Sequence, residues 1–426
     1  MCSLLIHSYS APMTLSKTSG KTPIALHQDP TSDTPASRAK GMYVMTEPGC
    51  IKSYSGAFLH ITNGIRELSR YYHIDILAPK AVQPYIQNGN FTLIPSPEKR
   101  TVVDMNTGPN TNKLYGLLKD LKTLLVNHLP FFRYYRQVKA ARPDFIYERI
   151  SYLNFNAFLI AKLLNIPYIT EVNGVYYEEI RHYYHSWLNG LARRLMLATY
   201  RRSDICYMVG GLKQSHGLDG GHYISVQNGI ETQFIDRLKD HKKQLELPLQ
   251  LCFVGHLAYH HRIEVLLDAL RKLKQPQHIH IHFIGANFES LHQAIPPQIQ
   301  HTFHGMVKHE QLLDLLQQFH VGLIPACRPG DSFMKLYTYG AAKLMCIVPR
   351  QRNVEQTFDK GELRFFELEN SGQLAACIDE VVQQPEMIHT YGQRLYQTVR
   401  QRFTWTSIFE QVHTEIQRLL HARQGR

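Results

Sequence analysis

The sequence predicts two doubly wound α/β domains in tandem, each built on a parallel sheet. Three observations support this fold class. Short apolar runs typical of buried strands alternate with segments whose apolar residues have helical spacing, and this alternation starts twice, near residue 42 and near residue 249. A hydrophobic fraction of 44% and a charged fraction of 19% are typical of a globular protein. The length of 426 residues provides enough sequence for two cores.

The first domain is expected to begin after a flexible leader. Residues 1–41 contain 12 Ser or Thr and 4 Pro without an apolar period, which is typical of a segment that buries too little surface to fold. A strand is then predicted over 42–46, a Pro/Gly loop over 47–56, a helix over 57–72 and a strand over 73–77. This order is the opening of a parallel βαβ unit.

The same alternation predicts the rest of the chain. In an N-terminal domain over 42–230 we expect helices over 113–139, 151–164 and 178–200, and strands over 145–148, 167–172, 204–209 and 223–227. A hydrophilic linker follows over 231–247. In a second domain over 248–395 we expect strands over 249–254, 278–284, 299–304, 321–325, 345–349 and 363–368, and a helix over 263–273. Residues 396–426 are expected to be helical, with a crossing back to the first domain as one option.

Positive charge is concentrated in two segments of the first domain. Residues 113–142 contain seven Lys or Arg and one acid, Asp120, and residues 181–203 contain five Arg and no acid, so these segments hold nearly all of the net charge of +12. Leucines at helical spacing lie among the cations of the first segment. Such a helix suits the surface of an anionic membrane, packing against a core, or a solvated face. Single-stranded nucleic acid is disfavoured, because the sequence contains no recognised nucleic-acid module.

Several other classes are disfavoured. No apolar run reaches 18 residues and the first residues lack a secretory pattern, so a cytoplasmic protein is expected. The seven cysteines form no CxxC pair and the histidine clusters lack a neighbouring carboxylate pattern, so no metal site is expected. The sequence contains neither a P-loop nor a GxGxxG pattern, which disfavours P-loop kinases and simple nicotinamide dehydrogenases.

Two motifs carry a resemblance to a known family. Tyr147-Glu148-Arg149 and Glu171-Val172-Asn173-Gly174 resemble the first domain of glycosyltransferase family 4, and the resemblance continues through 201–209, 226–231 and the strands of the second domain, over about 42–410. The family consists of retaining sugar transferases with the GT-B fold, in which two Rossmann-like domains face a cleft. The resemblance implies a nucleoside diphosphate sugar as substrate, no cofactor, no obligatory metal and no protein nucleophile.

Candidate residues on the acceptor side follow from this resemblance and from their residue types. Gly56 would let a loop approach a diphosphate or an acceptor closely, with an ordinary turn as the alternative. Glu148 and Arg149 close a strand at its carboxyl end, where sites form in parallel sheets, with an internal salt bridge as the alternative. Glu171 and Gly174, the first and last residues of the second motif, complete this group.

Two further residues are candidates near the reacting centre. His60 would face the cleft, where it could donate a hydrogen bond to a phosphate or an acceptor hydroxyl; a buried core histidine is the alternative. Asn173 stands where many relatives have a histidine. It can form hydrogen bonds but cannot act as a base near neutral pH, and a plain turn residue is the alternative.

The donor side departs from the family pattern. Gly255 ends the first strand of the second domain, and His256, His261 and Arg262 follow where relatives carry other cationic or polar residues. Lys335 matches the family's lysine and is the first candidate for a catalytic role.

The family's two glutamates, separated by seven residues, fall on Gly330 and Thr338. Asp331, beside the first of these positions, could substitute, and Thr338 offers one hydroxyl to a donor ribose. Lys343 replaces the usual glycine after this block. An inactive donor pocket is therefore an alternative.

The sequence thus predicts a retaining glycosyltransferase of hexosyltransferase type. It would move a sugar to a glycan or lipid-linked acceptor at the cytosolic face of a membrane, in the synthesis of cell-surface polysaccharide or glycolipid. A catalytically degenerate GT-B scaffold is the main alternative. A sugar-nucleotide epimerase shares the fold, but the Tyr-Glu-Arg and Glu-Val-Asn-Gly motifs oppose it.

Overall fold

The computed structural model describes residues 38–45, 56–79, 91–96, 113–183, 186–240, 243–255, 257, 261–327, 330, 332 and 334–425. Residues 1–37 of the predicted leader and the predicted loop up to residue 55 lie outside the described residues, as do the candidates His256 and Asp331. The first strand begins at Lys40, two residues before its predicted start. Within the described ranges no helix is both long and apolar enough to cross a membrane.

The first half of the chain forms a seven-stranded sheet with the order β3-β2-β1-β4-β5-β6-β7, in which every pairing is parallel. Its strands are β1 (Lys40–Met45), β2 (His73–Pro79), β3 (Phe91–Ser96), β4 (Phe145–Arg149), β5 (Tyr168–Val172), β6 (Ile205–Val209) and β7 (Tyr223–Val226). The sequence did not predict β3, which contains Pro95. Proline is tolerated there because β3 is an edge strand.

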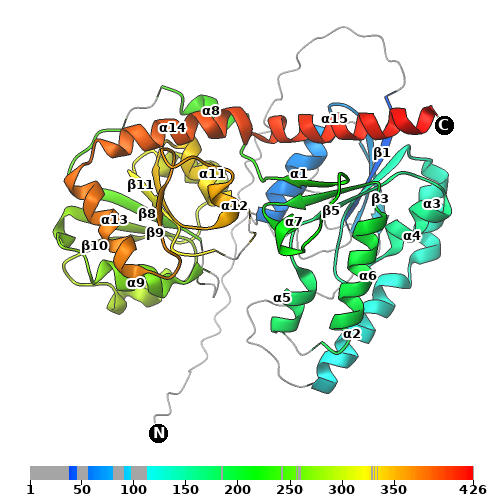
Figure 1. The fold of residues 1–426 in the computed structure, drawn as a ribbon, viewed down its shortest axis with the longest axis horizontal. Coiled ribbons are helices and arrows are strands. Elements are labelled where there is room, and N and C mark those ends of the chain that lie inside the picture. Colours follow the sequence, from blue (N-terminus) through cyan, green and yellow to red (C-terminus); the bar gives the residue numbers. More distant parts are fainter. Residues whose placement is uncertain are drawn as a thin grey trace, which may run out of the picture. The chain divides into compact units, whose positions relative to one another are not determined.

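Helices cover both faces of this sheet (Figure 1). They are α1 (Gly56–Leu68), α2 (Lys113–His128), α3 (Phe131–Ala141), α4 (Asn156–Leu163), α5 (Tyr176–Tyr183), α6 (Asn189–Arg202) and α7 (Leu212–Ser215). The single helix predicted over 113–139 was wrong. The chain breaks at Pro130, which lacks an N–H and caps the start of α3.

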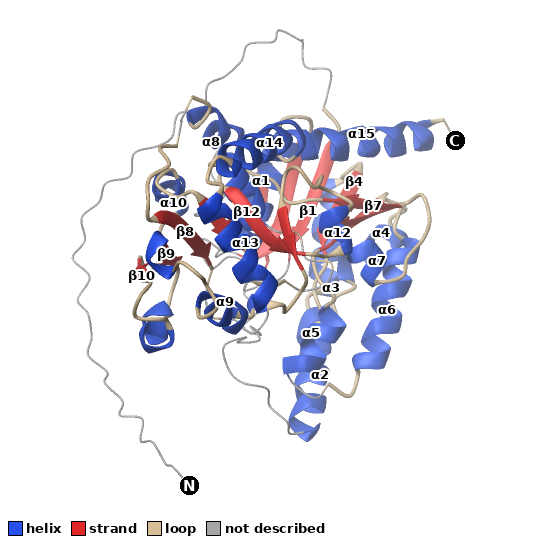
Figure 2. Ribbon diagram, turned by 60° about the vertical axis from the view of Figure 1, so that its left-hand side comes forward, coloured by secondary structure: helices blue, strands red, loops and turns tan. Residues whose placement is uncertain are grey.

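The second half forms a six-stranded parallel sheet with the order β10-β9-β8-β11-β12-β13. Its strands are β8 (Leu249–Val254), β9 (Ile279–Ile284), β10 (Gln300–Phe303), β11 (Val321–Leu323), β12 (Met345–Pro349) and β13 (Arg364–Phe366). The remaining helices are α8 (Thr232–Arg237), α9 (Ile263–Leu270), η4 (Pro276–His278), η5 (Phe288–Ala294), α10 (His309–Leu316), α11 (Met334–Ala341), α12 (Arg352–Glu355), α13 (Ser371–Gln383), α14 (Met387–Arg402) and α15 (Trp405–Gln424). Figure 2 distinguishes the two sheets from the helices around them.

The last two helices belong to different cores. Helix α14 packs with α11 and buries Leu395, Tyr396 and Val399 in the second half. Helix α15 lies along α1 (Figure 1), and its apolar face joins the core under β1, β4 and β6. That face consists of Trp405, Ile408, Phe409, Val412 and Ile416.

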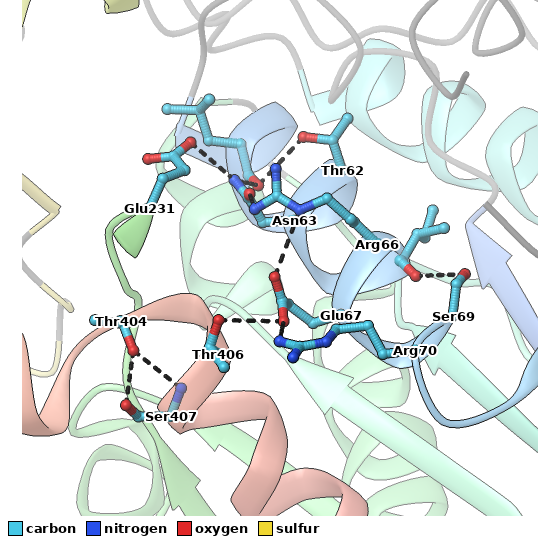
Figure 3. A network of polar contacts seen from close by, with 12 residues as sticks. Thr62, Asn63, Arg66, Glu67, Ser69, Arg70, Glu231, Thr404, Thr406 and Ser407 are labelled. Atoms are coloured by element: carbon cyan, nitrogen blue, oxygen red, sulfur yellow. Dashed lines mark hydrogen bonds and ion pairs between the residues drawn. The ribbon is translucent and has the colours of Figure 1, made fainter. Parts of the chain in front are cut away.

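The two chain segments that pass between the halves are paired with each other. The N–H of Ile230 donates to the carbonyl of Phe403 (2.9 Å), and the N–H of Trp405 donates to the carbonyl of Ile230 (3.0 Å). Figure 3 shows the polar contacts beside this pair: Asn63 of α1 donates to Glu231 (3.2 Å), and Thr406 donates to Glu67 of α1 (3.3 Å). Helix α1 is therefore bound to both passing segments.

Candidate functional site

Sheet topology locates where ligands can bind. In the first sheet the strand order reverses between β1 and β4, and in the second between β8 and β11. Ligands of open parallel sheets bind at the carboxyl ends of the strands next to such a switch point. Arg149 ends β4, and Gly255 follows β8 directly. Both residues therefore lie at switch points.

A buried carboxylate organises the first of these edges. Glu171 of β5 is 1% exposed and accepts hydrogen bonds from Tyr147 Oη (2.5 Å), Arg149 Nη1 (3.0 Å) and Asn173 Nδ2 (2.6 Å). Burial alone would raise the pKa of Glu171, but the charges of His60 and Arg149 and the bond from Tyr147 hold this pKa well below its usual range. Glu171 is therefore ionised and holds three polar side chains in place.

His60 bridges this carboxylate to the segment after β7. Its Nδ1 lies 2.7 Å from Oδ1 of Asn228, and its Nε2 lies 3.0 Å from Oε2 of Glu171. The Nε2 contact is close enough for an ion pair, but it is not aligned as a hydrogen bond. The ring is 2% exposed and lies edge-on to Trp405 of α15, with centroids 5.1 Å apart. His60 is thus fixed in orientation between Glu171 and Asn228.

These residues line a cavity of about 250 Å³. His60, Arg149 and Asn173 contribute to its wall from the first half, and the segment before α11 contributes from the second half. The complete lining is Ala57, His60, Arg149, Asn173, Val209, Leu212, Asn228, Gly330, Ser332 and Met334. Three of the candidates selected from the sequence therefore share one cavity.

Other acceptor-side candidates lie elsewhere. Glu148 alternates with Arg149 along β4, and its carboxylate accepts a short hydrogen bond from Tyr168. Tyr168 belongs to the core on the opposite face of the sheet from Tyr147. The two acids of the motifs are therefore separated by the sheet, and Arg149 pairs with Glu171 rather than with Glu148. Gly56 begins α1, directly before Ala57 of the cavity wall, and Gly174 is buried after β5.

A second cluster forms at the switch point of the second sheet. Lys335 Nζ donates to His261 Nε2 (2.8 Å) and lies 5.0 Å from the ring centroid of Phe253. A β-carbon at Gly255 would lie 3.2 Å from the ring of His261 and 3.3 Å from Lys335 Nζ. Glycine therefore leaves the space that these two side chains occupy. The sequence candidates Gly255, His261 and Lys335 are brought together here.

Three remaining donor-side positions differ from the family pattern in distinct ways. Arg262 points to acids, with Nε 2.6 Å from Glu264 and Nη1 3.3 Å from Glu369. The hydroxyl of Thr338 donates to the carbonyl of Met334 in its own helix (3.0 Å). Gly330 has φ +85, and a β-carbon there would lie 2.5 Å from Ser215 Oγ. A glutamate at position 330 would therefore be strained and would require the Ser215 side chain to move.

Sequence reasoning did not select Asn228, Ser332 or Tyr147 as site residues. Asn228 lies within the segment 226–231 that carries the family resemblance, and Tyr147 lies within the first motif. Ser332 accepts a hydrogen bond from the N–H of Asn228 (3.1 Å) and donates to Gln227 (3.1 Å). Ser332 lies in the block before Lys335 that resembles the family, but its contact with Asn228 joins residues 104 positions apart and is not visible in the local sequence.

Comparisons with known proteins agree with this architecture. Residues 262–414 match the family described as glycosyl transferase-like. A sucrose-phosphate synthase from Thermosynechococcus elongatus has 12% identity, with 90% of this chain and 100% of that chain covered at a TM-score of 0.68. A glycosyltransferase from Rickettsia africae has 14% identity, with 90% and 99% covered at a TM-score of 0.66. HepE from Anabaena, whose structure was solved with UDP, has 12% identity, with 89% and 99% covered at a TM-score of 0.64.

No curated protein matches the sequence significantly. The similarity to solved structures establishes the fold: two parallel-sheet α/β domains in the GT-B arrangement of glycosyltransferases.

Proposed function

We propose that the protein is a retaining glycosyltransferase of hexosyltransferase type, which moves a sugar from a nucleoside diphosphate sugar to a glycan or lipid-linked acceptor. The observation that carries this proposal is the cavity in which His60, Arg149 and Asn173 meet the segment leading into α11. Lys335 is the second residue of α11 and donates a hydrogen bond to His261. Cationic and polar groups thus line the carboxyl edges of both sheets, where the GT-B fold has room for a donor and an acceptor.

The donor side supplies positive charge for a leaving diphosphate. We assign this role to Lys335, with His261 accepting one of its three N–H bonds and so orienting the ammonium group. Fixed charge aimed at a developing anion stabilises a transition state without reorganisation. The HepE structure with UDP-glucose is a precedent for this class of donor in the fold. Thr338, His256 and Asp331 remain proposed donor contacts, and Arg262 would have to leave Glu264 and Glu369 to join them.

The acceptor side would orient a hydroxyl. We assign this role to His60 and Asn173, which Glu171 holds in place from below. Arg149 adds a positive charge to the same wall. We propose no protein nucleophile, and retention would then follow from attack on the face that the diphosphate leaves.

A peripheral position on the cytosolic face of a membrane is part of this proposal. Helix α2 is attached to the fold by its polar side: Asp120 accepts from Ser186 (2.5 Å), and Asn127 donates to the carbonyls of Tyr152 and Leu153 (both 3.0 Å). Leu124 packs against the core, whereas four other leucines of α2, and Leu129 and Phe132 after it, are exposed. These six residues recur every three or four positions and are 47% to 77% exposed: Leu114, Leu118, Leu121, Leu125, Leu129 and Phe132.

This exposed stripe excludes core packing as the reason for those leucines. Lys119, Lys122, Arg133 and Arg136 lie on the same pair of helices. An apolar stripe among cations suits an anionic phospholipid surface, where each cation adds about 1 kcal/mol at low salt. Synthesis of a polysaccharide or glycolipid from lipid-linked intermediates would use such a position.

The membrane proposal predicts loss of vesicle binding in two kinds of variant. Replacing Leu118 and Leu125 by Ser should lower the partition coefficient onto anionic vesicles, measured by sedimentation, by about 10-fold or more per leucine. The reason is that burying a leucine contributes about 1.5 kcal/mol or more. Replacing Lys119, Lys122, Arg133 and Arg136 by Glu should also weaken it. Leu163→Ser, at another exposed leucine, is the matched control. Unchanged binding in both folded variants would exclude this face.

The donor proposal is tested by calorimetry with nucleoside diphosphates. Lys335→Ala should remove a charge-assisted bond of about 1.5 to 3 kcal/mol, which weakens donor binding by about 10- to 150-fold. Lys272→Ala, at an exposed lysine of the same half, is the control. If the parent protein binds none of the common nucleoside diphosphates or their sugars, the transferase proposal fails.

A catalytically degenerate scaffold is the second candidate. It is favoured by Gly330, where an acid would be strained, and by the Thr338 hydroxyl, which is bonded within its own helix. Thr338→Glu separates the two functions. Tighter nucleotide binding would indicate a weakened but intact donor pocket, whereas a destabilised domain would indicate a pocket rebuilt without the acid.

A further inference from the structure

A larger cavity lies in the second half of the chain and shares no lining residue with the site above. Its volume is about 720 Å³, within the range of small-molecule pockets. Its lining is Lys239, Asp240, Lys243, Lys343, His389, Thr390 and Gln393. These residues come from the segment after α8, from the turn between α11 and β12, and from α14. Three lysines and one acid therefore share one wall.

Lys343 occupies a position that disfavours a side chain. Its φ is +55, in the left-handed region where glycine is at ease and a lysine is strained. Its ammonium group nevertheless lies in the cavity wall, where it donates a short hydrogen bond to the carbonyl of Lys239 and sits 4.9 Å from the ring centroid of Tyr396. The strained backbone thus places a positive charge at this point.

Lys243 brings a second charge into the same wall. It is 8% exposed, and Nζ donates to the carbonyls of Leu316 (3.4 Å) and Gln317 (3.2 Å) at the end of α10. Burial and, to a smaller extent, the charge of Lys343 lower the pKa of Lys243 to about 8. The two ammonium groups therefore repel each other across the cavity.

Two histidines lie at this wall. His389 lines the cavity, and His320 is buried beside it, with Nε2 2.9 Å from the carbonyl of Gln244. Burial and the charge of Lys243 lower the pKa of His320, so its neutral form is favoured. Asp240 also lies in the lining, and its charge favours the ammonium form of Lys343. Among the described lining residues, three lysines thus accompany one carboxylate.

We propose that this cavity binds a small phosphorylated molecule, such as a sugar phosphate, through Lys239, Lys243 and Lys343. A multiply charged phosphate would relieve the repulsion between the lysines, because each ammonium gains a counter-charge within hydrogen-bond reach. The volume exceeds that of a phosphate group alone. Thr390 and Gln393 can donate to and accept from hydroxyl groups, as an attached sugar would require.

Thermal unfolding of the full chain tests this site with three probes: inorganic pyrophosphate, glucose 6-phosphate and glucose. We expect the melting temperature to rise with glucose 6-phosphate and to stay constant with glucose. Lys343→Gly should raise the dissociation constant of glucose 6-phosphate by about 10- to 150-fold. Without ligand this variant should remain folded, because the relief of strain at φ +55 offsets the loss of the contacts with Lys239 and Tyr396. Lys272→Ala, at an exposed lysine outside the cavity, should bind as the parent does.

A second variant separates this site from the proposed donor site. Lys335→Ala should retain the glucose 6-phosphate titration if the phosphate occupies this cavity. The proposal is overturned if none of the phosphorylated probes stabilises the parent, if Lys343→Gly titrates as the parent does, or if Lys335→Ala abolishes the effect. Equal affinity for pyrophosphate would show that the lysines read the phosphate group alone. These outcomes are independent of whether the protein transfers sugars.

Discussion

At the scale of single residues, the site depends on one buried charge. Glu171 is surrounded by His60, Arg149, Tyr147 and Asn173, and its carboxylate balances the cations in a place that is almost closed to water. Removing one partner of a buried ion pair leaves the other charge without compensation, which is far more costly than losing a surface pair. The acid is therefore expected to matter for stability as well as for orientation.

Glu171→Gln should lower the free energy of unfolding at pH 7 by about 3 kcal/mol, within the range of about 3 to 5 kcal/mol for a broken buried pair. Because the folded pKa of Glu171 lies below its unfolded value, its contribution is present above about pH 4.3 and is lost as the pH falls further. The deficit should therefore shrink in acid. Urea unfolding at pH 7 and pH 3.5 measures both effects.

Glu148→Gln is the matched control, because Glu148 is equally buried and its hydrogen bond comes from the neutral Tyr168. Equal losses in the two variants would contradict the role given to the charge of Glu171.

The sequence allowed part of this site to be predicted. Arg149 could be selected because it ends a strand that was visible as an apolar run, whereas Glu171 and Asn173 were selected from the resemblance of their motif to a known family. His60 could be selected only as a lone histidine on an apolar helix, and its partner Asn228 is 168 residues away in the chain. Such a pairing depends on how α1 meets the segment after β7, which local patterns do not encode.

At the scale of elements, tight contacts between helices identify which glycines have a structural role. Gly64 of α1 faces α15, and a β-carbon there would lie 2.8 Å from Cζ of Phe409. Gly190 of α6 is exposed, and a β-carbon there would meet nothing within 4 Å. Both glycines lie in helices, but of the two Gly64 is the one in close contact with another helix. An alanine is therefore expected to have opposite effects on stability at the two positions.

Gly64→Ala should destabilise the protein by up to about 2 kcal/mol, since overpacking costs about 1 to 3 kcal/mol and alanine returns about 1 kcal/mol of helix propensity. Gly190→Ala should stabilise it by up to about 1 kcal/mol. Chemical unfolding of both variants measures the difference. A stabilised Gly64→Ala would mean that α15 is not held against α1 in the way described.

Helices and strands could be predicted where the spacing of the apolar residues and the length of the segment both fitted one type of element. They were missed where the segment was too short or too polar to show such a spacing. Both sheets followed from buried runs such as those of β4, β5 and β12. The predicted linker over 231–247 contains α8, whose Phe234 and Ile235 are buried in the second core. A helix of six residues is shorter than the span over which a helical period can be recognised, so it was hidden in a hydrophilic segment.

At the scale of the whole molecule, one contact joins the segment after β6 to the segment before α11. The N–H of Gly211 donates to the carbonyl of Gly330 (2.9 Å), and a β-carbon at Gly330 would lie 2.5 Å from Ser215 Oγ. Gly217 also has a positive φ of +60, but a β-carbon there would meet nothing within 4 Å. Comparing variants at Gly330 and Gly217 therefore separates the cost of backbone strain from the loss of the contact with Gly211.

Gly330→Ala and Gly217→Ala should share the cost of a left-handed alanine, about 1 kcal/mol. Gly330→Ala alone should also break the contact with Gly211. Hydrogen exchange should then become faster at residues 210–216 in Gly330→Ala and remain at the parent rate there in Gly217→Ala. Identical exchange in the two variants would exclude this contact as a link between the halves.

The place of α15 has a consequence for the order in which the protein can form during synthesis. Residues 38–230 leave the ribosome first, but the face of their sheet that α15 covers stays open until residues 405–424 have been made. At 5 to 20 residues per second this interval lasts roughly 10 to 40 s. The second half can bury its own two faces in the meantime. The half that is translated first is therefore the half that is completed last, and its apolar face is exposed to chaperones and to other nascent chains throughout that interval.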